Sequence, residues 1–384
     1  MGRLSLIFFV GVCGCVEATE ALPPPAAPAP VPMLSSAQIT HVAIGWDDLC
    51  LLAGGKVLCK KDWSDAPTAS SFVGLPIDGA VELSIGRKHA CARVVSGGLA
   101  CWGDRAAFAP GQPGIARVPE AVPGFADVVE VRVSETATCT RRADGTIWCV
   151  GLVGNAKLGD VAFAAPTRVK GVDKASMLSL GGGSLCARRL DGTVWCRGPK
   201  GQSTTLANLD HVVDVAATSA WTCARRTSGS VQCFHPEEAA SVSAKPVPMA
   251  YAHEDPSLPS VGGILDAVSL VGGEGHACVL RSNGTVVCFG ENDYGQLGDG
   301  SRAASGEPRP VRKLTSAVAI ACGEGRTCAQ RADGTVVCWG RDLLDDSMFH
   351  ALTGRRAKPG PPGEHDSLAP EPLRVPSVVP MTKG

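Results

Sequence analysis

The sequence predicts an all-β fold, a seven-bladed β-propeller built from four-stranded antiparallel blades. Three observations lead to this prediction. A hairpin bounded by two cysteines recurs seven times along the 384-residue chain. An alternating apolar strand precedes each hairpin, and a proline-containing segment follows several of them, as expected of an outer edge strand. The hairpins span residues 50–59, 91–101, 139–149, 186–196, 223–233, 278–288 and 328–338.

The first 14 residues have the pattern of an export signal peptide. Arg3 is the positive flank, and the apolar run 4–12 is too short to cross a bilayer as a helix. The run ends in Cys13-Gly14-Cys15, which resembles a bacterial lipobox, so we expect Cys15 to be acylated and to become the mature N-terminus. The alternative is ordinary cleavage near Ala18, which would give a secreted protein. Either route leads to an oxidising compartment, where disulfides persist.

Residues 15–36 are predicted to hold the lipid anchor and a tether, and residues 37–384 the propeller. The tether is rich in proline and alanine between residues 21 and 33. Proline removes backbone donors and fixes φ, so this stretch can form neither helix nor sheet. An extended proline-rich chain would hold the propeller away from its anchor.

The spacing of each cysteine pair predicts a disulfide across its own hairpin. In the copy at 139–149, a three-residue loop with Gly145 in a left-handed conformation places Cys139 opposite Cys149. The shorter copy turns on Gly54-Gly55 and again opposes its two cysteines. The alternatives are buried unpaired cysteines or zinc ligands, although one opposed pair offers a metal only two ligands. The expected pairs are Cys50 with Cys59, Cys91 with Cys101, Cys139 with Cys149, Cys186 with Cys196, Cys223 with Cys233, Cys278 with Cys288, and Cys328 with Cys338.

Cys322 remains without a partner in this scheme. It occupies the inward strand position that Ile44, Ile85 and Leu180 fill in other repeats. We therefore expect a small buried apolar residue rather than a nucleophile, which would need an exposed and electropositive setting.

The sixth repeat resembles the regulator of chromosome condensation repeat. The resemblance rests on residues 283–290, Asn-Gly-Thr-Val-Val-Cys-Phe-Gly, and 291–300, Glu-Asn-Asp-Tyr-Gly-Gln-Leu-Gly-Asp-Gly. It extends over about 39–345, with a trace at 154–160, while the fourth and fifth repeats lack the Gly-Gln-Leu-Gly run. The resemblance implies a seven-bladed propeller. The family's eukaryotic founder is a nuclear nucleotide exchange factor that docks on chromatin, and bacterial relatives include secreted inhibitors that clamp an enzyme, so protein binding is the inherited expectation.

Charge and motifs narrow the possible functions. The chain has 36 basic and 37 acidic residues and a net charge of -1, which gives no bulk electrostatic reason to bind nucleic acid or an anionic membrane. Contact with a membrane is expected only through the lipid anchor. The sequence contains no Gly-x-Ser-x-Gly, His-Glu-x-x-His or phosphate-loop motif. We therefore expect no enzymatic activity, no cofactor and no metal.

The candidate binding residues lie in the loops just before the hairpins, which vary from repeat to repeat. His89 and His276 share one repeat position and would be either a pair of functional groups at the propeller mouth or turn histidines bonded to backbone. The insertions 235–262 and 341–368 could contact a partner. The candidate residues are Trp46, Asp48, Arg87, His89, Trp221, His276 and Arg326.

These observations favour a monomeric propeller, tethered to the bacterial cell envelope, that binds an unknown protein partner or acts as a scaffold. The alternatives are a hydrolase or lyase with its site at the propeller mouth, a purely structural envelope protein, and an exchange factor for a small GTPase. At the C-terminus, residues 370–375 repeat the outer-edge pattern of 308–311. We expect this segment to pair with a strand near the N-terminus or in the seventh blade and so close the ring.

If Cys15 is acylated, Cys15→Ser should move the protein from the membrane fraction to the soluble fraction and abolish labelling by a lipid precursor. Fractionation and labelling of cells producing either form measure this directly. A mutant that stays with membranes would rule out the lipid anchor.

Overall fold

The structure, a computed structural model, describes the repeat region of the chain. The chain divides into two units, residues 1–31 and 32–384, and all described residues belong to the second. Cys15, the tether and nearly all of both insertions lie outside the described residues, so what the sequence indicates for them stays a prediction. No helix in the described part is long and apolar enough to span a membrane. The described residues are 39–46, 48–60, 72–112, 114–153, 161–198, 201–206, 209–218, 221–234, 261, 263–341, 367–372 and 379–380.

The strands form seven sheets that follow one another along the chain, one for each repeat, and consecutive strands within a sheet are antiparallel. Blade one contains β1 (Ile39–Ile44), β2 (Leu49–Ala53), β3 (Lys56–Lys60) and β4 (Val73–Leu75). Blade two contains β5 (Ala80–Ile85), β6 (His89–Val94), β7 (Leu99–Asp104) and β8 (Ile115–Ala121), with a short 3-10 helix, η2 (Arg105–Ala107), after β7. Blade three contains β9 (Val128–Val133), β10 (Ala137–Arg142), β11 (Ile147–Val153) and β12 (Val161–Arg168).

The second half of the chain repeats this order. Blade four contains β13 (Ala175–Gly181), β14 (Ser184–Arg189), β15 (Val194–Arg197) and β16 (Ser203–Thr205). Blade five contains β17 (Val212–Ala217), β18 (Thr222–Arg226) and β19 (Val231–Phe234), so three of its strands fall in the described residues. Blade six contains β20 (Ala267–Gly272), β21 (His276–Arg281), β22 (Val286–Gly290) and β23 (Ser305–Pro310). Blade seven contains β24 (Ala317–Cys322), β25 (Arg326–Arg331), β26 (Val336–Gly340) and β27 (Ser367–Pro372).

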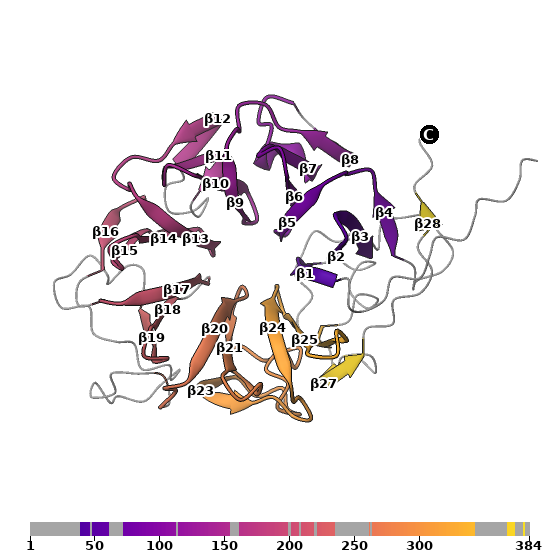
Figure 1. The fold of residues 1–384 in the computed structure, drawn as a ribbon, viewed down its shortest axis with the longest axis vertical. Coiled ribbons are helices and arrows are strands. Elements are labelled where there is room, and N and C mark those ends of the chain that lie inside the picture. The colour runs from indigo at the N-terminus through magenta and orange to yellow at the C-terminus, as the bar shows by residue number, and fades with distance from the viewer. Residues whose placement is uncertain are drawn as a thin grey trace, which may run out of the picture. The chain divides into compact units, whose positions relative to one another are not determined.

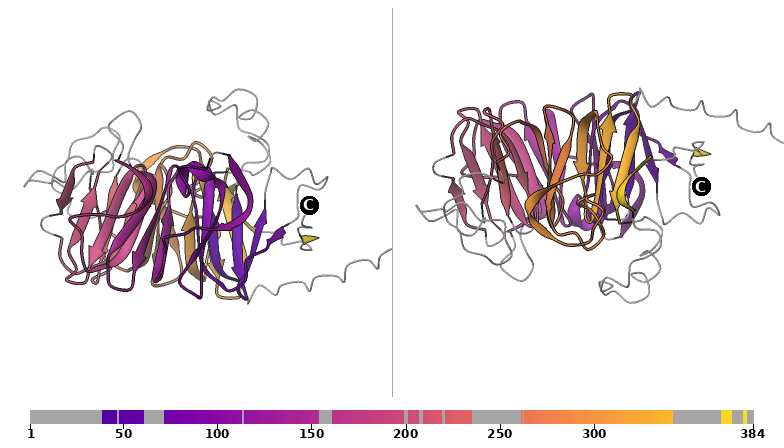
Figure 2. Two further views of the ribbon diagram at one scale, coloured as in Figure 1. Left: turned by 90° about the horizontal axis from the view of Figure 1, so that it is seen from above. Right: turned by 90° about the horizontal axis from the view of Figure 1, so that it is seen from below.

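The blades are arranged as a ring around a central axis, which confirms the predicted β-propeller. Figure 1 looks down this axis, and the first strand of every blade lies innermost. The side views in Figure 2 show the strands running through the thickness of the ring. The innermost strands are β1, β5, β9, β13, β17, β20 and β24.

The hairpins have the predicted register. Cys139 is directly opposite Cys149, and Cys50 is opposite Cys59 across the shorter turn. Gly145 has a φ of 77°, and Gly54 and Gly55 have φ of 56° and 76°, the left-handed conformations that these turns require. All seven predicted disulfides are formed, with Cα separations of 3.9 to 4.1 Å, and Cys322 is the free cysteine among the described residues.

The hydrophobic core is divided into seven clusters, and each cluster fills the seam between two adjacent blades. The seam between blades one and two, for example, packs Leu52 and Val57 against Leu83 and Trp102. Every cluster also contains the disulfide of the preceding blade, including the seam that joins blade seven to blade one. Each bridge therefore serves as buried apolar surface for the next blade as well as a link across its own hairpin.

Blade seven closes the ring against blade one, as the sequence predicted. The C-terminal segment pairs with the seventh blade, with Pro372 opposite Val337. Across the closing seam, the Gln330 side chain donates a hydrogen bond to the Ile39 carbonyl at 2.9 Å. The sequence did not predict β28 (Val379–Pro380), which pairs in parallel with β4 of blade one.

The innermost strands are edge strands, and in blades three to six side chains from the preceding blade accept hydrogen bonds from some of their free N–H groups. In blades two, three and five, one inner-strand position carries a carboxylate that also pairs with an arginine of its own blade. Each carboxylate accepts a hydrogen bond from a backbone N–H of the next blade. These bonds run from Val131 to Glu82 (3.3 Å), from Leu178 to Glu130 (3.2 Å) and from Leu270 to Asp214 (3.0 Å).

Glu130→Ala should destabilise the propeller by about 2 to 4 kcal/mol, because it removes a buried carboxylate and leaves two partly buried arginines and the Leu178 N–H without their partner. Glu130 is 6% exposed and bonds Arg141 at 2.8 Å and Arg132 at 2.9 Å. Asp173→Ala is the matched control: it removes an exposed pair with Arg168 and should cost at most about 1 kcal/mol. Denaturant unfolding compares the two variants, and equal losses would show that the inter-blade carboxylate contributes no more than a surface pair.

Candidate functional site

One face of the propeller carries the loops that join the first and second strands of each blade, and we call it the mouth face. The first strands line a central cavity of about 880 Å³, to which all seven blades contribute. Glycines end several of these strands because adjacent strands converge there. A Cβ atom on Gly45 would lie 2.5 Å from the Gly86 carbonyl oxygen, so a side chain cannot fit. Convergence of the strands at these glycines brings loops from different blades together.

An arginine–aromatic cluster, composed of Trp46, Arg87, Tyr294 and Arg341, lies on the mouth face. Trp46 is stacked between two guanidinium groups: the Arg87 group is 4.2 Å from the ring centroid and the Arg341 group 3.9 Å. The Arg341 guanidinium also lies 5.4 Å from the Tyr294 ring. Cation–π contacts of this kind hold the indole in place between blades one, two and seven.

Ion pairs connect the arginine–aromatic cluster to blade three and add a second contact with blade seven. Arg87 lies 3.7 Å from Glu135 of blade three and 4.0 Å from Glu324 of blade seven. Lys88 lies 3.4 Å from the same Glu135 oxygen, and both of these side chains are about half exposed. The result is a surface on which aromatic, basic and acidic groups from five blades lie at fixed positions, which suits recognition of a protein surface.

The predicted binding residues do not all lie together. Trp46 and Arg87 belong to the arginine–aromatic cluster, and Arg326 lies beneath it, buried, where its guanidinium donates to the Arg341 carbonyl. The Asp48 carbonyl accepts a bond from the Gly45 N–H within the first loop. Trp221 is part of a separate region, where it packs against the seam of blades five and six.

Sequence reasoning missed the contributions of Arg341 and Tyr294. Arg341 opens the insertion within blade seven, between β26 and β27, and Tyr294 lies in the loop between β22 and β23. Both are about 250 residues or more from Trp46 along the chain. No local pattern links them to Trp46. The available signal was composition alone, since tryptophan, tyrosine and arginine are the residue types most enriched at interface hot spots.

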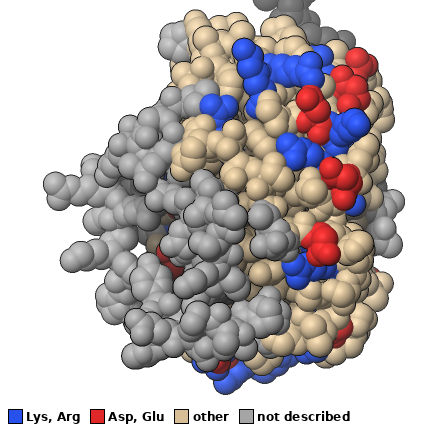
Figure 3. All heavy atoms as spheres, turned by 90° about the vertical axis from the view of Figure 1, so that its left-hand side faces the viewer, with Lys and Arg blue, Asp and Glu red and all other residues tan. Residues whose placement is uncertain are grey.

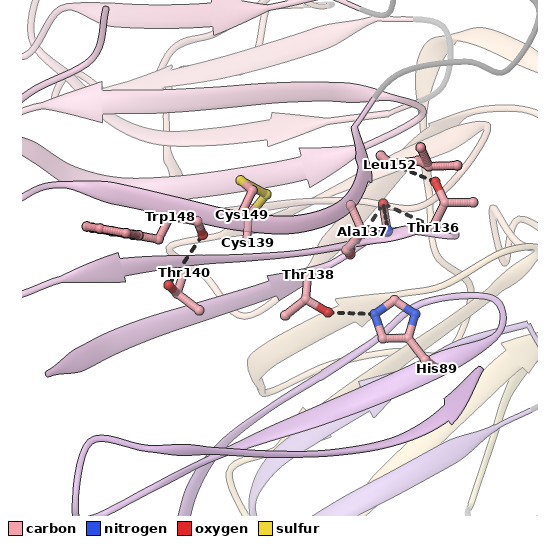
Figure 4. The surroundings of a disulfide bond; sticks show 10 residues. His89, Thr136, Ala137, Thr138, Cys139, Thr140, Trp148, Cys149 and Leu152 are labelled. Carbon is pink, nitrogen blue, oxygen red and sulfur yellow. Dashed lines mark hydrogen bonds between the residues drawn. A yellow bond between two sulfur atoms is a disulfide. The ribbon is translucent and has the colours of Figure 1, made fainter. Parts of the chain in front are cut away.

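The two histidines connect neighbouring blades rather than facing solvent. The His89 Nε2 lies 2.8 Å from the Thr138 hydroxyl of blade three, and the His276 Nε2 lies 2.8 Å from the Thr327 hydroxyl of blade seven. Figure 4 shows His89 reaching across the seam toward Thr138, beside the Cys139–Cys149 bridge. The expectation that these rings bond to backbone is wrong: each bonds a threonine hydroxyl of the next blade, and both are buried within the ring.

Burial keeps both imidazoles neutral. It lowers the pKa of His89 to about 3 and the pKa of His276 to about 4, because a charged ring would lose its hydration in the seam. Burial likewise raises the pKa of the Cys322 thiol to about 12. Neither histidine is therefore poised for acid–base chemistry at neutral pH, and the Cys322 thiol is not activated as a nucleophile.

Charged side chains also line the central cavity, but they bond one another. Arg132 donates to Glu82 at 2.7 Å and pairs with Glu130 at 2.9 Å. Burial raises the pKa of Asp214, against the opposing effect of its bonds to Leu270 and Arg225. These groups serve the contacts between blades, so the loops of the mouth face rather than the cavity wall carry the accessible polar chemistry.

Comparison with known proteins identifies a repeat family in one part of the chain. Residues 267–296 and 283–330 match the Regulator of chromosome condensation (RCC1) repeat. No curated protein sequence matches the chain. The fold is similar to that of Prp20p from Saccharomyces cerevisiae (16% identity, TM-score 0.60, 77% of each chain covered), described with its binding to Gsp1p and histones.

Two further structures share the fold. One is yeast RCC1 (Prp20) bound to Kap60, with 15% identity, a TM-score of 0.60, and coverage of 94% of this chain and 91% of that chain. The other is human WBSCR16, with 18% identity, a TM-score of 0.59, and coverage of 74% and 84%. At these identities the likeness concerns the fold.

Acidification should destabilise the protein partly through His89. Its folded pKa of about 3 lies below the ordinary histidine pKa of 6.5, so the unfolded chain binds the proton more strongly. The stability due to neutral His89 is thus full above pH 6.5 and is lost as pH falls toward 3. His89→Gln keeps a hydrogen-bonding side chain that does not titrate. Between pH 7 and 5 the natural protein should lose about 2 kcal/mol more than this variant in denaturant unfolding, and parallel pH profiles would contradict the assignment.

Proposed function

Since the chain is a member of the regulator of chromosome condensation (RCC1) repeat family, we propose that it is an exported protein-binding module that recognises its partner through the mouth face. The observation that carries the proposal is the arginine–aromatic cluster. It offers Trp46 and Tyr294, both partly exposed, beside Arg87 and the half-exposed pair Lys88 and Glu135.

The physical properties of the cluster favour a protein as the partner. Trp46 is already held by two guanidinium groups before a partner arrives, so little side-chain entropy remains to be lost on binding. Tryptophan, tyrosine and arginine are the residue types most enriched among the hot spots of protein interfaces. The acidic and basic groups at its rim would set the orientation of the partner and the rate of association.

The charge distribution supports a protein partner over nucleic acid. On the side of the propeller drawn in Figure 3, basic and acidic side chains are interspersed over the described residues. This agrees with the net charge of -1. Binding to a phosphate backbone depends on clustered basic residues. The solved yeast propellers are described with the proteins Gsp1p, histones and Kap60, which supports a binding role without identifying a partner for this chain.

The seven disulfides support export, because such bridges persist in oxidising compartments. We further propose that acylated Cys15 and the proline-rich tether hold the propeller at the surface of a bacterial envelope as a monomer. In this arrangement the mouth face meets partners in the same compartment. The alternative is a secreted protein without an anchor, in which case the natural form would already be soluble in the Cys15→Ser experiment.

Trp46→Ala and Lys88→Glu should each weaken partner binding at least about 10-fold, because one removes the central aromatic group and the other reverses a charge at its rim. Leu190→Ala is the control, since Leu190 is 70% exposed and lies in a strand-two to strand-three hairpin, away from the mouth face. Quantitative pull-downs from an envelope extract, with each variant immobilised at the same density, measure the retained partner.

The Lys88→Glu variant separates a loss of binding from a folding defect, because Lys88 is exposed and its replacement removes no packing. A partner that is retained equally by Lys88→Glu, Trp46→Ala and Leu190→Ala would exclude the mouth face as the binding surface. A partner lost from all three would point to the opposite face or to a general defect.

A further inference from the structure

We propose that the seam between blades six and seven is a redox-gated site for a thiophilic cation such as Zn²⁺, with Cys322, His276 and Cys278 as its protein ligands. One potential ligand atom from each of the three side chains lies within 4.8 Å of the others. Thiolate and imidazole groups are the ligands that Zn²⁺ favours, and three protein ligands leave a fourth position for water. This inference is independent of the proposed binding function.

The position of the site gives a cation a route of entry. Cys322 is partly exposed and lines the central cavity, whereas His276 and Cys278 are fully buried behind it. The Cys322 thiol would therefore be met first, and the two buried ligands would complete the site. An incoming cation would have to displace the proton of this thiol, because a thiolate rather than a thiol is the metal ligand.

His276 has one ring nitrogen without a hydrogen-bond partner among the described residues. The Thr327 hydroxyl donates its hydrogen to the Gln296 carbonyl at 2.9 Å, so the same oxygen must accept the hydrogen of His276 Nε2 at 2.8 Å. This arrangement fixes the tautomer and leaves a lone pair on Nδ1. The Nδ1 atom is buried and has no hydrogen-bond partner among the described residues. A buried acceptor without a partner is costly, and a bound cation would satisfy it.

The Cys278–Cys288 bridge closes the site in the oxidised protein. The Cys278 sulfur is bonded to the Cys288 sulfur, so Cys278 has no thiolate that could bind a cation. A dithiol reductant would supply two electrons and two protons: the S–S bond breaks, Cys278 and Cys288 become thiols, and the reductant becomes a disulfide. The cation then replaces the thiol protons of Cys278 and Cys322, which are released to solvent.

The seam between blades two and three provides a natural control. It has the same histidine, threonine and bridge, since His89 bonds Thr138 and the hydroxyl lies 3.7 Å from the Cys91 sulfur. Valine replaces the free cysteine, as Val133 packs against Cys91 in that seam. Reduction of the Cys91 bridge would thus give two protein ligands, His89 and Cys91. Reduction of the Cys278 bridge would give three.

The test uses Cys288→Ala, prepared anaerobically, in which Cys278 is a free thiol without any reductant. We expect it to bind one Zn²⁺ per chain by native mass spectrometry, with an affinity from chelator competition at least about 10- to 100-fold above that of the natural disulfide-bonded protein. Adding Cys322→Val, which copies the other seam, or His276→Ala should reverse the gain. Cys101→Ala alone should not bind Zn²⁺. The double variant Cys101→Ala with Val133→Cys should bind it.

Two results would overturn the proposal: equal Zn²⁺ affinity in Cys288→Ala and Cys101→Ala, or binding by Cys288→Ala that survives Cys322→Val. If Cys288→Ala does not fold, partial reduction of the natural protein decides the question. Zn²⁺ should then slow the alkylation of Cys278 and Cys322 together, as mapped by peptide mass spectrometry. Alkylation of the two residues at the same rate with and without Zn²⁺ would refute the site.

Discussion

The seam between adjacent blades is the contact on which the rest of the structure depends. A four-stranded sheet has two apolar faces, and neither is covered until a neighbour packs against it. In this chain each seam contains the disulfide of the preceding blade, so sulfur atoms occupy space that larger side chains could fill. Aromatic residues make up only 5% of the sequence, which makes this use of cystine important to the core. The bridges thus stabilise the blades both as covalent links and as packing surface.

Polar contacts follow the same direction around the ring as the packing. Carboxylates, serines and glutamine of one blade bond the inner strand of the next, as in the bonds from Val133 to Ser84 and from Ala217 to Ser179, both 2.9 Å long. These contacts position the inner strands, and the inner strands position the loops of the mouth face. The orientation of Trp46 therefore depends on interactions made deep in the ring as well as on its own guanidinium neighbours.

The sequence predicted the contacts that are local and left open those that are not. Turn glycines and the two-residue period set the register of Cys139 with Cys149, so the hairpins, the seven bridges and the free Cys322 could be derived from spacing. The bond from His89 to Thr138 could not, because its partners are 49 residues apart and meet only once two blades are packed. The stack of Arg341 on Trp46 joins opposite ends of the chain for the same reason. The half-buried setting of Cys322, at the cavity wall rather than in the core, likewise depends on how the blades converge.

Closure of the ring by residues nearly 300 positions apart has a consequence for how the protein is made. The Ile39 carbonyl and the apolar face of blade one acquire their partners, Gln330 and Val336, only when the last blade has formed. A chain delivered across a membrane from its N-terminus would expose that face throughout translocation, while blades two to six stack in order behind it. We therefore expect the newly delivered protein to depend on a holding chaperone until its final residues arrive, and shortened products to be cleared by proteases.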